Sequence, residues 1–331
     1  MILVLSKPGD VHADRVEAVL RARGAPFVRF DPGEIGAART VLEHGPEGAT
    51  TRITTAHGTI DLGEVSVVWL RRPTAPRPGD AITDPAMRRY LALELELLQD
   101  GMWHALDCAW LPGRHAQLRS ADHKLAQLQL AAGLGFSVPP SLITNDPAEL
   151  ARFYEQHGGQ LISKLASPAM FWTEPRIAVR YTRPVELADL GYAASMLRHA
   201  PMLFQPRIAK ARELRVTVVG DRVFAAAIDS QRNHRTAVDS RGDFTRTHYE
   251  AHALPAAIEA RCRALTERSG LGFATIDLIV TPGGDHVFLE LNPSGQYLWI
   301  EERTGLPITL AVAELLIRHE VHHDDVPLGY G

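Results

Sequence analysis

The sequence predicts a mixed α/β (α+β) protein built from two or three packed units. Short apolar segments with strand character alternate with amphipathic helical segments along the chain, a pattern typical of sheets covered by helices. The 331 residues are 45% hydrophobic, which is enough material for more than one core. No segment repeats and none has low complexity, so the pattern does not indicate a repeat architecture.

Composition and charge narrow the class of protein. The formal net charge is −4, so no overall positive field favours a nucleic-acid partner. Two cysteines, Cys108 and Cys262, provide no disulfide framework and are typical of a reducing cytosol. No apolar stretch reaches the length of a membrane span, and the opening apolar run is too short for a signal peptide. We therefore expect a cytoplasmic protein with neither a nucleic-acid nor a membrane partner.

Residues 1–114 have the pattern of a small α/β unit. The predicted elements are strands at 2–6, 26–30 and 65–73, helices at 12–24 and from Asp84 towards Asp107, and a hairpin at 51–62. Arg71 and Arg72 stand at the end of the third strand, where α/β sheets place ligands. Two solvated arginines ahead of a proline are the alternative interpretation.

The character of the sequence changes near residues 112–116, where we place a boundary. A second unit is predicted at 115–202 and a third at 203–331. The elements predicted for the second unit are helices at 120–136, with Ser120 as N-cap, and at 145–159, and strands at 138–144 and 160–166. Those of the third are a strand at 202–206, a hairpin turned at Gly220-Asp221, a helix at 255–270, and paired strands at 273–280 and 286–292.

Three oxygen-bearing side chains are expected to meet on this last pair of strands. Glu290 and Asn292 are two residues apart, so their side chains point to the same face of the strand. Asp277 lies thirteen positions before Glu290, and a turn between the strands would bring it alongside. Carboxylate and amide oxygens are ligands that suit Mg²⁺. A polar strand end beside a turn is the simpler alternative.

Several motifs in order resemble the ATP-grasp superfamily. They are Lys124, Lys164, the segment "LFQPRIAKARELRVTVVGDRVF" (203–224), Asp277 and "LELNPSG" (289–295). The resemblance runs from about residue 115 to the C-terminus. It implies an ATP-grasp fold with a central domain at 115–202 and a C-terminal domain at 203–331, preceded by an N-terminal α/β (pre-ATP-grasp) domain at 1–114.

The resemblance also implies cofactors and roles for individual residues. ATP is the expected nucleotide, and Asp277, Glu290 and Asn292 are expected to hold one or two Mg²⁺ ions. The nucleotide contacts that it implies are Lys124, Lys164 and Arg215 at the phosphates, Gln205, Arg207 and Ile208 of the hinge at the adenine, and Glu213 at the ribose. Taken singly, each lysine also fits an ordinary surface position.

A narrower resemblance covers nearly the whole chain. "VWLRRP" (68–73), "AIDSQ" (227–231), "TAVDSR" (236–241) and the segment 289–308 are similar to the ATP-grasp maturases of graspetides, the microviridin-like peptides. This implies a ligase that phosphorylates Asp or Glu side chains of a precursor peptide with a leader and a Thr/Glu/Asp-rich core. Thr, Ser or Lys side chains of that peptide then close ester or amide rings. Asp239 and Arg241 match a DxR element near the core peptide, with catalytic roles implied for Arg241, Arg215 and Asp239.

Other interpretations remain open at this stage. A RimK-like ligase that adds free amino acids is the alternative enzyme, and a nucleotide-binding module without ligase chemistry is the alternative class. The general base is not evident, with Asp239 and His234 as candidates. The loop after Lys164 lacks the glycines that usually fold over phosphates. The amphipathic segment "LALELELLQ" (91–99) suits either a core or a homodimer contact.

Overall fold

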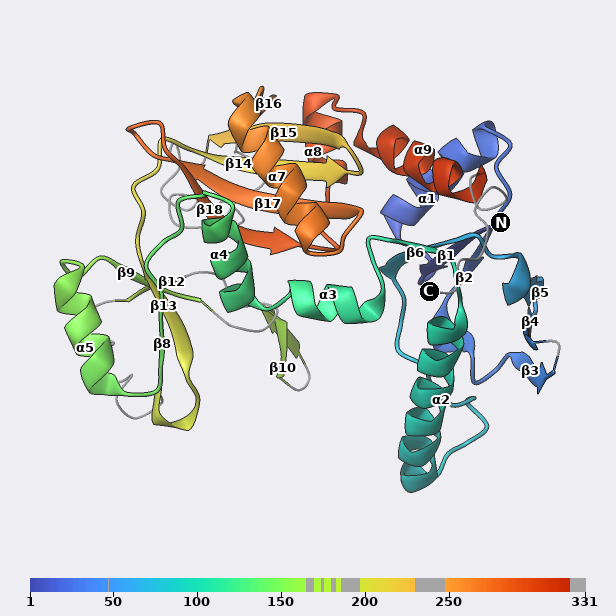
Figure 1. The fold of residues 1–331 in the computed structure, drawn as a ribbon. Coiled ribbons are helices and arrows are strands. Elements are labelled where there is room, and N and C mark those ends of the chain that lie inside the picture. The colour runs from blue at the N-terminus through green and yellow to red at the C-terminus, as the bar shows by residue number, and fades with distance from the viewer. Residues whose placement is uncertain are drawn as a thin grey trace.

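A four-stranded parallel sheet with the strand order β2-β1-β6-β7 forms the N-terminal part of the computed structural model (Figure 1). Its strands are β1 (Ile2–Ser6), β2 (Phe27–Phe30), β6 (Val67–Arg72) and β7 (Ala109–Leu111), and helix α1 (Val11–Ala22) connects the first two. All five residues of β1 are buried, as expected for a parallel strand that is covered on both faces. The predicted strands and the first helix are confirmed.

A small antiparallel sheet flanks this unit. It consists of β3 (Arg39–Gly45), β4 (Gly48–Thr55) and β5 (Gly58–Asp61), and short 3-10 turns at Pro32–Glu34 and Leu62–Glu64 connect it to its neighbours. The predicted hairpin at 51–62 corresponds to β4 and β5. The sequence did not reveal β3, because its two apolar residues, Val41 and Leu42, are adjacent rather than alternating.

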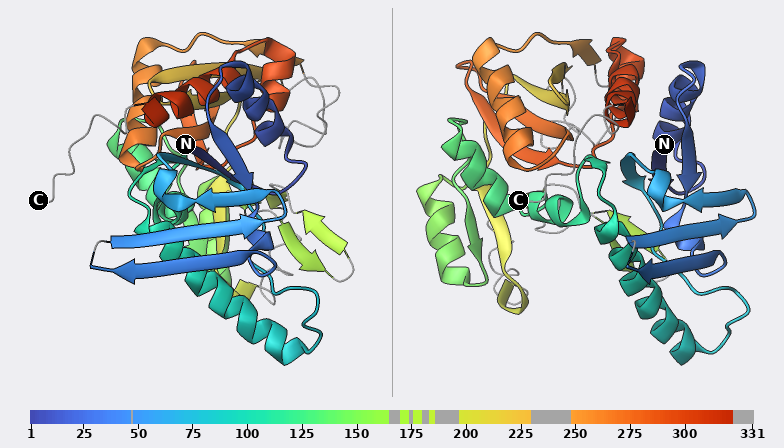
Figure 2. Two further views of the ribbon diagram at one scale, coloured as in Figure 1. Left: turned by 90° about the vertical axis from the view of Figure 1, so that its right-hand side faces the viewer. Right: turned by 45° about the vertical axis from the view of Figure 1, so that its right-hand side comes forward.

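Helix α2 (Pro85–Ala105) extends away from the rest of the protein (Figure 2). It begins where the sequence predicts, because the Asp84 carboxylate accepts a hydrogen bond from the Met87 amide at 2.7 Å and caps the first turn. Its C-terminal turns are anchored by Met102 and Trp103, which are buried against the N-terminal sheet. The N-terminal turns of α2 carry mostly exposed side chains.

The middle of the chain forms an antiparallel sheet with the order β12-β9-β13-β8. Its strands are β8 (Leu142–Thr144), β9 (Leu161–Lys164), β12 (Arg183–Val185) and β13 (Met202–Pro206). This part of the chain also contains helix α5 (Pro147–Gln156) and a 3-10 turn at Leu197–His199. Strands β10 (Met170–Thr173) and β11 (Arg176–Val179) pair with each other in a separate sheet. Asp146 caps α5, because its carboxylate accepts a hydrogen bond from the Ala148 amide at 2.8 Å. The predicted helix and strands are confirmed, although β8 is shorter than expected.

One sequence prediction for this region is wrong. The single helix expected from Ser120 is two helices, α3 (His115–Ala121) and α4 (Lys124–Gly133). Ser120 lies inside α3 and is not an N-cap, because the Gln117 side chain accepts a hydrogen bond from the Arg114 amide at 2.7 Å and starts the helix earlier. The helical conformation is interrupted between Ala121 and Lys124, so Lys124 lies in the first turn of α4.

The C-terminal part is a five-stranded antiparallel sheet with the order β16-β15-β14-β17-β18 (Figure 1). Its elements are β14 (Arg212–Val219), β15 (Arg222–Asp229), β16 (His248–Ala251), β17 (Phe273–Val280), β18 (His286–Asn292) and the helices α7 (Ala256–Arg268), α8 (Leu298–Thr304) and α9 (Ile308–Val321). Gly220 adopts φ +57° in the predicted turn between β14 and β15, a conformation that favours glycine. The predicted hairpin, helix and strand pair are confirmed.

The N-terminal and C-terminal sheets share one hydrophobic core. Val4 and Trp69 of the parallel sheet belong to the same buried cluster as Phe273, Tyr297 and Leu316. α9 lies alongside α1 (Figure 1), so the last described helix of the chain covers the first. The segment that follows β18 therefore runs between two sheets that are packed together.

The structure describes residues 1–46, 48–164, 170–173, 176–179, 183–185, 197–229 and 248–321. Within these ranges, no helix has both the length and the apolar character needed to cross a bilayer.

Candidate active site

Two neighbouring strands carry the three predicted oxygen ligands. The antiparallel register of β17 and β18 places Asp277 opposite Glu290, and Asn292 follows two residues later on the same face. Leu291, between Glu290 and Asn292, and its partner Ile276 on β17 point into the core and are buried. The three polar side chains are themselves half-buried. The predicted pairing and the common face are confirmed.

Lys124 reaches this face from the first turn of α4. Its Nζ lies 2.9 Å from Glu290 Oε2, and both side chains are about three-quarters covered. One turn further along α4, the buried Gln127 side chain donates to the Leu291 carbonyl at 2.8 Å and accepts from the Leu291 amide at 2.9 Å. β18 is the edge strand of the sheet. The Gln127 side chain therefore gives the Leu291 main chain the hydrogen-bond partners that a further strand would provide. It fixes α4, and hence Lys124, beside Glu290.

Arg215 joins the cluster from β14. It lies opposite Asp277, its Nη1 donates to Asp277 Oδ1 at 2.7 Å, and its Nη2 donates to the Gln296 carbonyl at 3.2 Å. The Arg215 side chain is 11% exposed, and its Nε has no hydrogen-bond partner in the part of the chain that the structure describes. A buried N–H without a partner suits an anionic group that binds at this place.

The donor set fits a hard divalent cation. Asp277, Glu290 and Asn292 offer carboxylate and amide oxygens side by side, the chemistry that Mg²⁺ prefers. Across the described ranges, no three His, Cys, Asp or Glu side chains are grouped as a metal site. The proposed magnesium site differs from such a group, because one of its three ligands, Asn292, is an amide. Lys124 and Arg215 add two positive charges at the same face, as expected where phosphates bind.

Lys164 and Gln205 lie on the middle sheet instead. Lys164 on β9 pairs in register with Leu203 of β13 and is half-buried. Gln205 is buried, and its Nε2 donates to Ser141 Oγ at 2.9 Å while its Oε1 has no partner among the described residues. An unpaired buried amide oxygen suits an N–H donor such as an exocyclic amine.

The remaining predicted nucleotide residues follow β13. Arg207 is exposed and Ile208 is half-buried in the segment that leads into β14. The Arg207 amide donates to the Gln160 carbonyl at 2.7 Å. Glu213 at the start of β14 forms an ion pair with Lys210. Arg207 and Ile208 therefore lie in the connection between the middle and C-terminal sheets, where a hinge is expected, and Glu213 lies on the strand that follows.

Two predicted catalytic residues cannot be placed. Asp239 and Arg241 lie outside the described residues, as does His234, the other candidate base. The same holds for most of the loop after Lys164.

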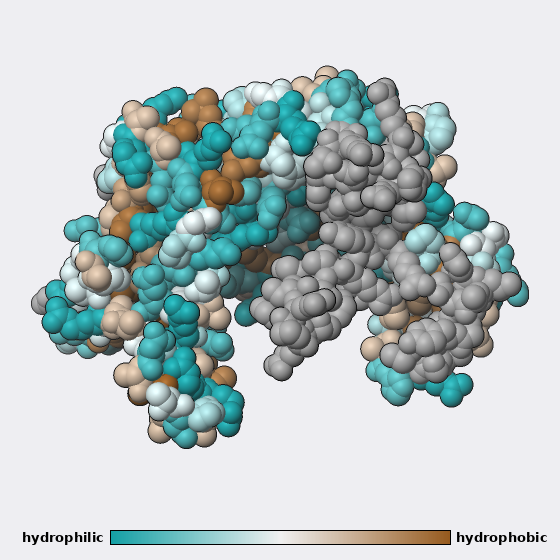
Figure 3. All heavy atoms as spheres, turned by 180° about the vertical axis from the view of Figure 1, so that it is seen from behind, coloured by the Kyte–Doolittle hydropathy of each residue, from teal (hydrophilic) through white to brown (hydrophobic). Residues whose placement is uncertain are grey.

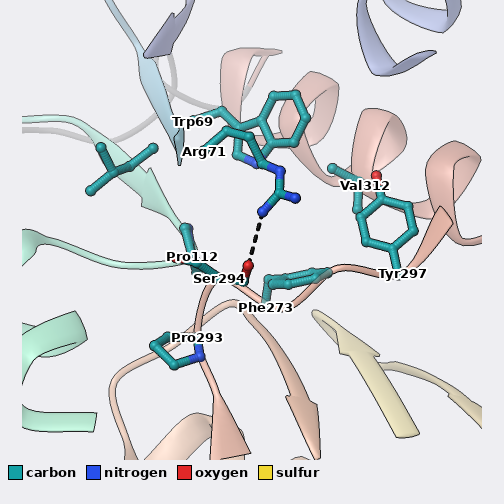
Figure 4. A pocket seen from close by; sticks show the side chains of 9 residues that line it. Trp69, Arg71, Pro112, Phe273, Pro293, Ser294, Tyr297 and Val312 are labelled. Atoms are coloured by element: carbon teal, nitrogen blue, oxygen red, sulfur yellow. Dashed lines mark hydrogen bonds between the residues drawn. The ribbon is translucent and has the colours of Figure 1, made fainter. Parts of the chain in front are cut away.

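The two arginines at the end of β6 have different environments. Arg71 is buried, and its Nη1 donates to the Ser294 carbonyl at 2.9 Å (Figure 4). Arg72 is exposed. When the Gln296 side-chain amide is oriented with its oxygen towards Arg72, that oxygen accepts hydrogen bonds from Nη1 and Nη2 of Arg72, each at 2.9 Å. The interpretation as two solvated arginines is therefore wrong for Arg71. The end of β6 lies against the segment that follows the proposed magnesium ligands.

His12 of α1 was not recognised from the sequence. Its Nε2 accepts hydrogen bonds from the amides of Tyr297 at 3.2 Å and Leu298 at 3.4 Å. Burial and the nearby Arg71 lower the pKa of His12 to about 4, although Asp10 opposes the shift. The imidazole is therefore neutral at pH 7 and can act as an acceptor. A lone histidine on a helix carries no sequence signal for such a role.

His12 should make stability depend on pH in a defined window. The pKa of His12 is about 4 in the folded protein and 6.5 as an unperturbed group, so the unfolded chain binds more protons between these values. The contribution of His12 to the free energy of unfolding is fully present above pH 6.5. It is lost as the pH drops towards 4, which lowers the free energy of unfolding by up to about 3 kcal/mol. His12→Gln should lack this part of the dependence, as urea unfolding across the window would show. Parallel curves for both proteins would contradict the assignment.

Comparison with known proteins places the chain in a family. No protein-family model matches it, and no curated protein does. Among solved structures, the macrocyclase MdnC from Microcystis aeruginosa MRC, bound with precursor peptide MdnA, is 30% identical with a TM-score of 0.83, covering 96% of this chain and 99% of MdnC. The chain is a graspetide-type ATP-grasp ligase.

Other structures agree with this membership. A RiPP-associated ATP-grasp ligase from Chryseobacterium gregarium, in complex with ADP and a leader and core peptide, is 27% identical with a TM-score of 0.88, covering 98% of the ligase described here and 97% of that chain. The ATP-grasp ligase PsnB, complexed with a phosphomimetic variant of a minimal precursor, Mg and ADP, is 25% identical with a TM-score of 0.75, covering 96% and 98%. The ATP-grasp fold and the family resemblance predicted from the sequence are confirmed.

The RimK alternative shares the fold alone. A RimK domain ATP-grasp protein from Sphaerobacter thermophilus is 15% identical to the ligase, with a TM-score of 0.54 over 96% of this chain and 99% of that chain. Both values are well below those of the macrocyclase MdnC.

Proposed function

We propose that the ligase uses ATP to join side chains within a ribosomal precursor peptide, forming ester or amide macrocycles. The observation that carries the proposal is the cluster on β17 and β18, where Asp277 and Glu290 face each other and Arg215 and Lys124 pair with them. Family membership supports the peptide substrate, because MdnC is a macrocyclase bound with its precursor peptide. The proposed peptide has a leader and a core rich in Thr, Glu and Asp.

The cofactors of this reaction would be ATP and Mg²⁺. The complexes of related ligases with ADP and with Mg support both. We propose that Asp277, Glu290 and Asn292 hold one or two Mg²⁺ ions. When bound, Mg²⁺ would neutralise charge on the phosphates as the γ-phosphoryl group is transferred.

The proposed nucleotide contacts extend over two sheets. Lys124 and Arg215 provide positive charge beside the carboxylates, and Lys164 provides it from β9. The proposed contacts to the rest of the nucleotide are Gln205, Arg207 and Ile208 at the adenine and Glu213 at the ribose. This arrangement supports the division of the ligase into parts 1–114, 115–202 and 203–331, with ATP held between the second and third.

The proposed reaction has two steps. A carboxylate oxygen of a peptide Asp or Glu attacks the γ-phosphorus, so an acyl phosphate forms and ADP leaves. A Thr or Ser hydroxyl, or a Lys amine, then attacks the acyl carbon, loses its proton and expels phosphate. Arg241 would hold the acceptor carboxylate through its forked N–H groups, and Asp239 is the candidate base for the proton.

Mass spectrometry of the products tests this function. A precursor peptide incubated with the ligase, ATP and Mg²⁺ should lose one water for each linkage, with one ADP and one phosphate released. Omitting ATP should leave the peptide unchanged. Gain of the mass of an added amino acid would instead support the RimK-like alternative, and AMP with pyrophosphate would indicate adenylation and contradict the proposal.

We further propose that the ligase forms a homodimer through α2. The exposed apolar side chains of this helix are Met87, Tyr90, Leu93, Leu97 and Leu98, at 41–70% exposure. Most of them form one stripe at helical spacing. In Figure 3, which views the molecule from behind, α2 is the lobe at the lower left. If two copies of α2 pair antiparallel near Leu93, Arg89 of one copy comes beside Glu96 of the other. The stripe thus has a charge pattern that suits a second copy of the same helix.

A charged substitution in this stripe should separate the subunits. Leu93→Asp combined with Leu97→Asp places two like charges at the centre of the proposed contact, so light scattering should show a dimer for the wild type and a monomer for the variant. Leu42→Asp on β3 introduces the same charge at another exposed leucine, 47% exposed, and should stay dimeric. A wild-type monomer, or a variant that remains a dimer, would exclude α2 as the interface.

A further inference from the structure

Segment 293–298 follows the proposed magnesium ligand Asn292 and is fixed against the C-terminal sheet. The Gln296 carbonyl accepts the hydrogen bond from Arg215. A Cβ at Gly295 would lie 1.8 Å from Thr275 Oγ1, so no larger residue fits between the segment and β17. The course of the backbone after Asn292 is therefore coupled to the position of Arg215.

The other side of this segment is held by the N-terminal sheet and by helix α1. Arg71 donates to the Ser294 carbonyl, and His12 accepts from the amides of Tyr297 and Leu298. The contacts span up to 286 positions of the sequence. Arg71, Trp69 and Tyr297 line a pocket between the parallel sheet and the segment (Figure 4). Main-chain groups at both ends of the segment are thus bound by residues of the first third of the chain.

The side chains that make these contacts are themselves rigidly placed. Asp10, His12 and Arg71 are each no more than 6% exposed. Asp10 Oδ1 accepts hydrogen bonds from the amides of His12 at 3.0 Å and Ala13 at 2.9 Å, and it lies 3.6 Å from Arg71 Nε. The carboxylate therefore caps α1 and balances the buried guanidinium at once. Residues on a strand end and a capped helix hold a partner more precisely than residues on a loop do.

We propose that His12 and Arg71 are positioning residues of the phosphoryl-transfer site. They fix segment 293–298, and through it the orientation of Asn292 and the Gln296 carbonyl that binds Arg215. The role deepens the proposed function and rests on it for the identity of the reaction. Helix α1 and strand β6 then shape the Mg²⁺ and phosphate site without touching either ligand. Loss of such outer contacts lowers metal affinity or activity about 10- to 100-fold in other proteins.

His12 offers a set of variants that separates positioning from stability. His12→Leu removes the acceptor, whereas His12→Gln places an amide oxygen at a reach similar to that of Nε2. Val16→Ala lies on the same helix, is fully buried and removes packing without touching a hydrogen bond. Arg71→Lys is an independent variant. Arg71 reaches the Ser294 carbonyl through Nη1 and the Asp10 carboxylate through Nε, whereas a lysine keeps the charge but has a single ammonium for both places.

The measurement is ADP binding by calorimetry at a series of Mg²⁺ concentrations. His12→Leu and Arg71→Lys should raise the Mg²⁺ concentration for half-maximal binding about tenfold or more. The kcat should fall in parallel, with a smaller change in the KM for ATP at saturating Mg²⁺. His12→Gln should behave nearly as the wild type, and Val16→Ala should lose stability but keep its Mg²⁺ dependence.

Two outcomes would overturn the inference. One is an unchanged Mg²⁺ dependence in His12→Leu or Arg71→Lys, and the other is an equal change in Val16→Ala. The binding measurement needs no peptide, so it is independent of the cyclisation reaction. A wild-type ligase that binds Mg²⁺ and ADP but never cyclises a peptide would contradict the proposed function and would leave this test valid.

Discussion

Glu290→Gln should abolish ATP turnover while leaving the fold intact. The substitution keeps the shape of the side chain but removes the charge that faces Asp277 and pairs with Lys124. A proposed Mg²⁺ ligand is then weakened, and charge stabilisation by such an ion contributes several kcal/mol to phosphoryl transfer. A loss of about 4 kcal/mol corresponds to about a thousandfold in kcat. Release of phosphate from ATP, with and without peptide, measures the effect.

The matched control is Glu259→Gln. Glu259 pairs with Arg263 on the exposed face of α7 at 3.0 Å, so the charge change is the same but lies on a helix surface. Such a pair contributes about 0.5 kcal/mol at most, and turnover should stay at the wild-type level. Near-normal turnover of Glu290→Gln at low Mg²⁺ would mean that the metal is held elsewhere.

Arg215→Lys is expected to have the second-largest effect. Arg215 uses two arms of its guanidinium, one to Asp277 and one to the Gln296 carbonyl, and its Nε remains available to a phosphate. A lysine keeps the charge but offers one ammonium, which cannot make both contacts and still reach a ligand. Loss of a donor of this kind lowers kcat by about 100- to 1,000-fold in other enzymes. Steady-state kinetics with saturating ATP would show a fall in kcat larger than any rise in KM.

Arg212→Lys is the control for this substitution. Arg212 lies three positions earlier on β14, and its Nη1 is 3.8 Å from Glu250 on the protein surface, where both side chains are about half exposed. Its replacement should leave kcat unchanged. If Arg212→Lys and Arg215→Lys lose activity equally, the effect belongs to the strand and not to the guanidinium in the site.

The pairing of the two strands of the site could be predicted from the sequence, but one detail of its register could not. A short turn separates the strands, and the pairs next to it, from Val280 with His286 to Leu278 with Phe288, would place Asp277 opposite Leu289 if they continued. A register shift between Asp277 and Leu278 brings Glu290 opposite Asp277 instead, and Leu291 is buried. The family resemblance implied a phosphate contact for Lys124 but not its place beside Glu290, because α4 approaches β18 from another part of the chain.

The contribution of the N-terminal sheet could not be predicted. Arg71 contacts Ser294 across 223 positions, and His12 contacts Tyr297 across 285. Both contacts are made to main-chain atoms, so no side-chain pattern at residues 293–298 indicates them. Ser120 shows that a local signal can also mislead. Serine is a common capping residue, but the Gln117 side chain accepts a hydrogen bond from the Arg114 amide and the helix begins before Ser120.

The transfer of oxygen from peptide to phosphate tests the central claim most directly. A precursor peptide whose Asp and Glu side-chain carboxylates carry heavy oxygen should be cyclised with ATP and Mg²⁺, and the released phosphate analysed by mass spectrometry. An acyl phosphate predicts that one heavy oxygen passes into phosphate for each ring that closes, with ADP as the nucleotide product. Unlabelled phosphate, or label in AMP, would contradict the account.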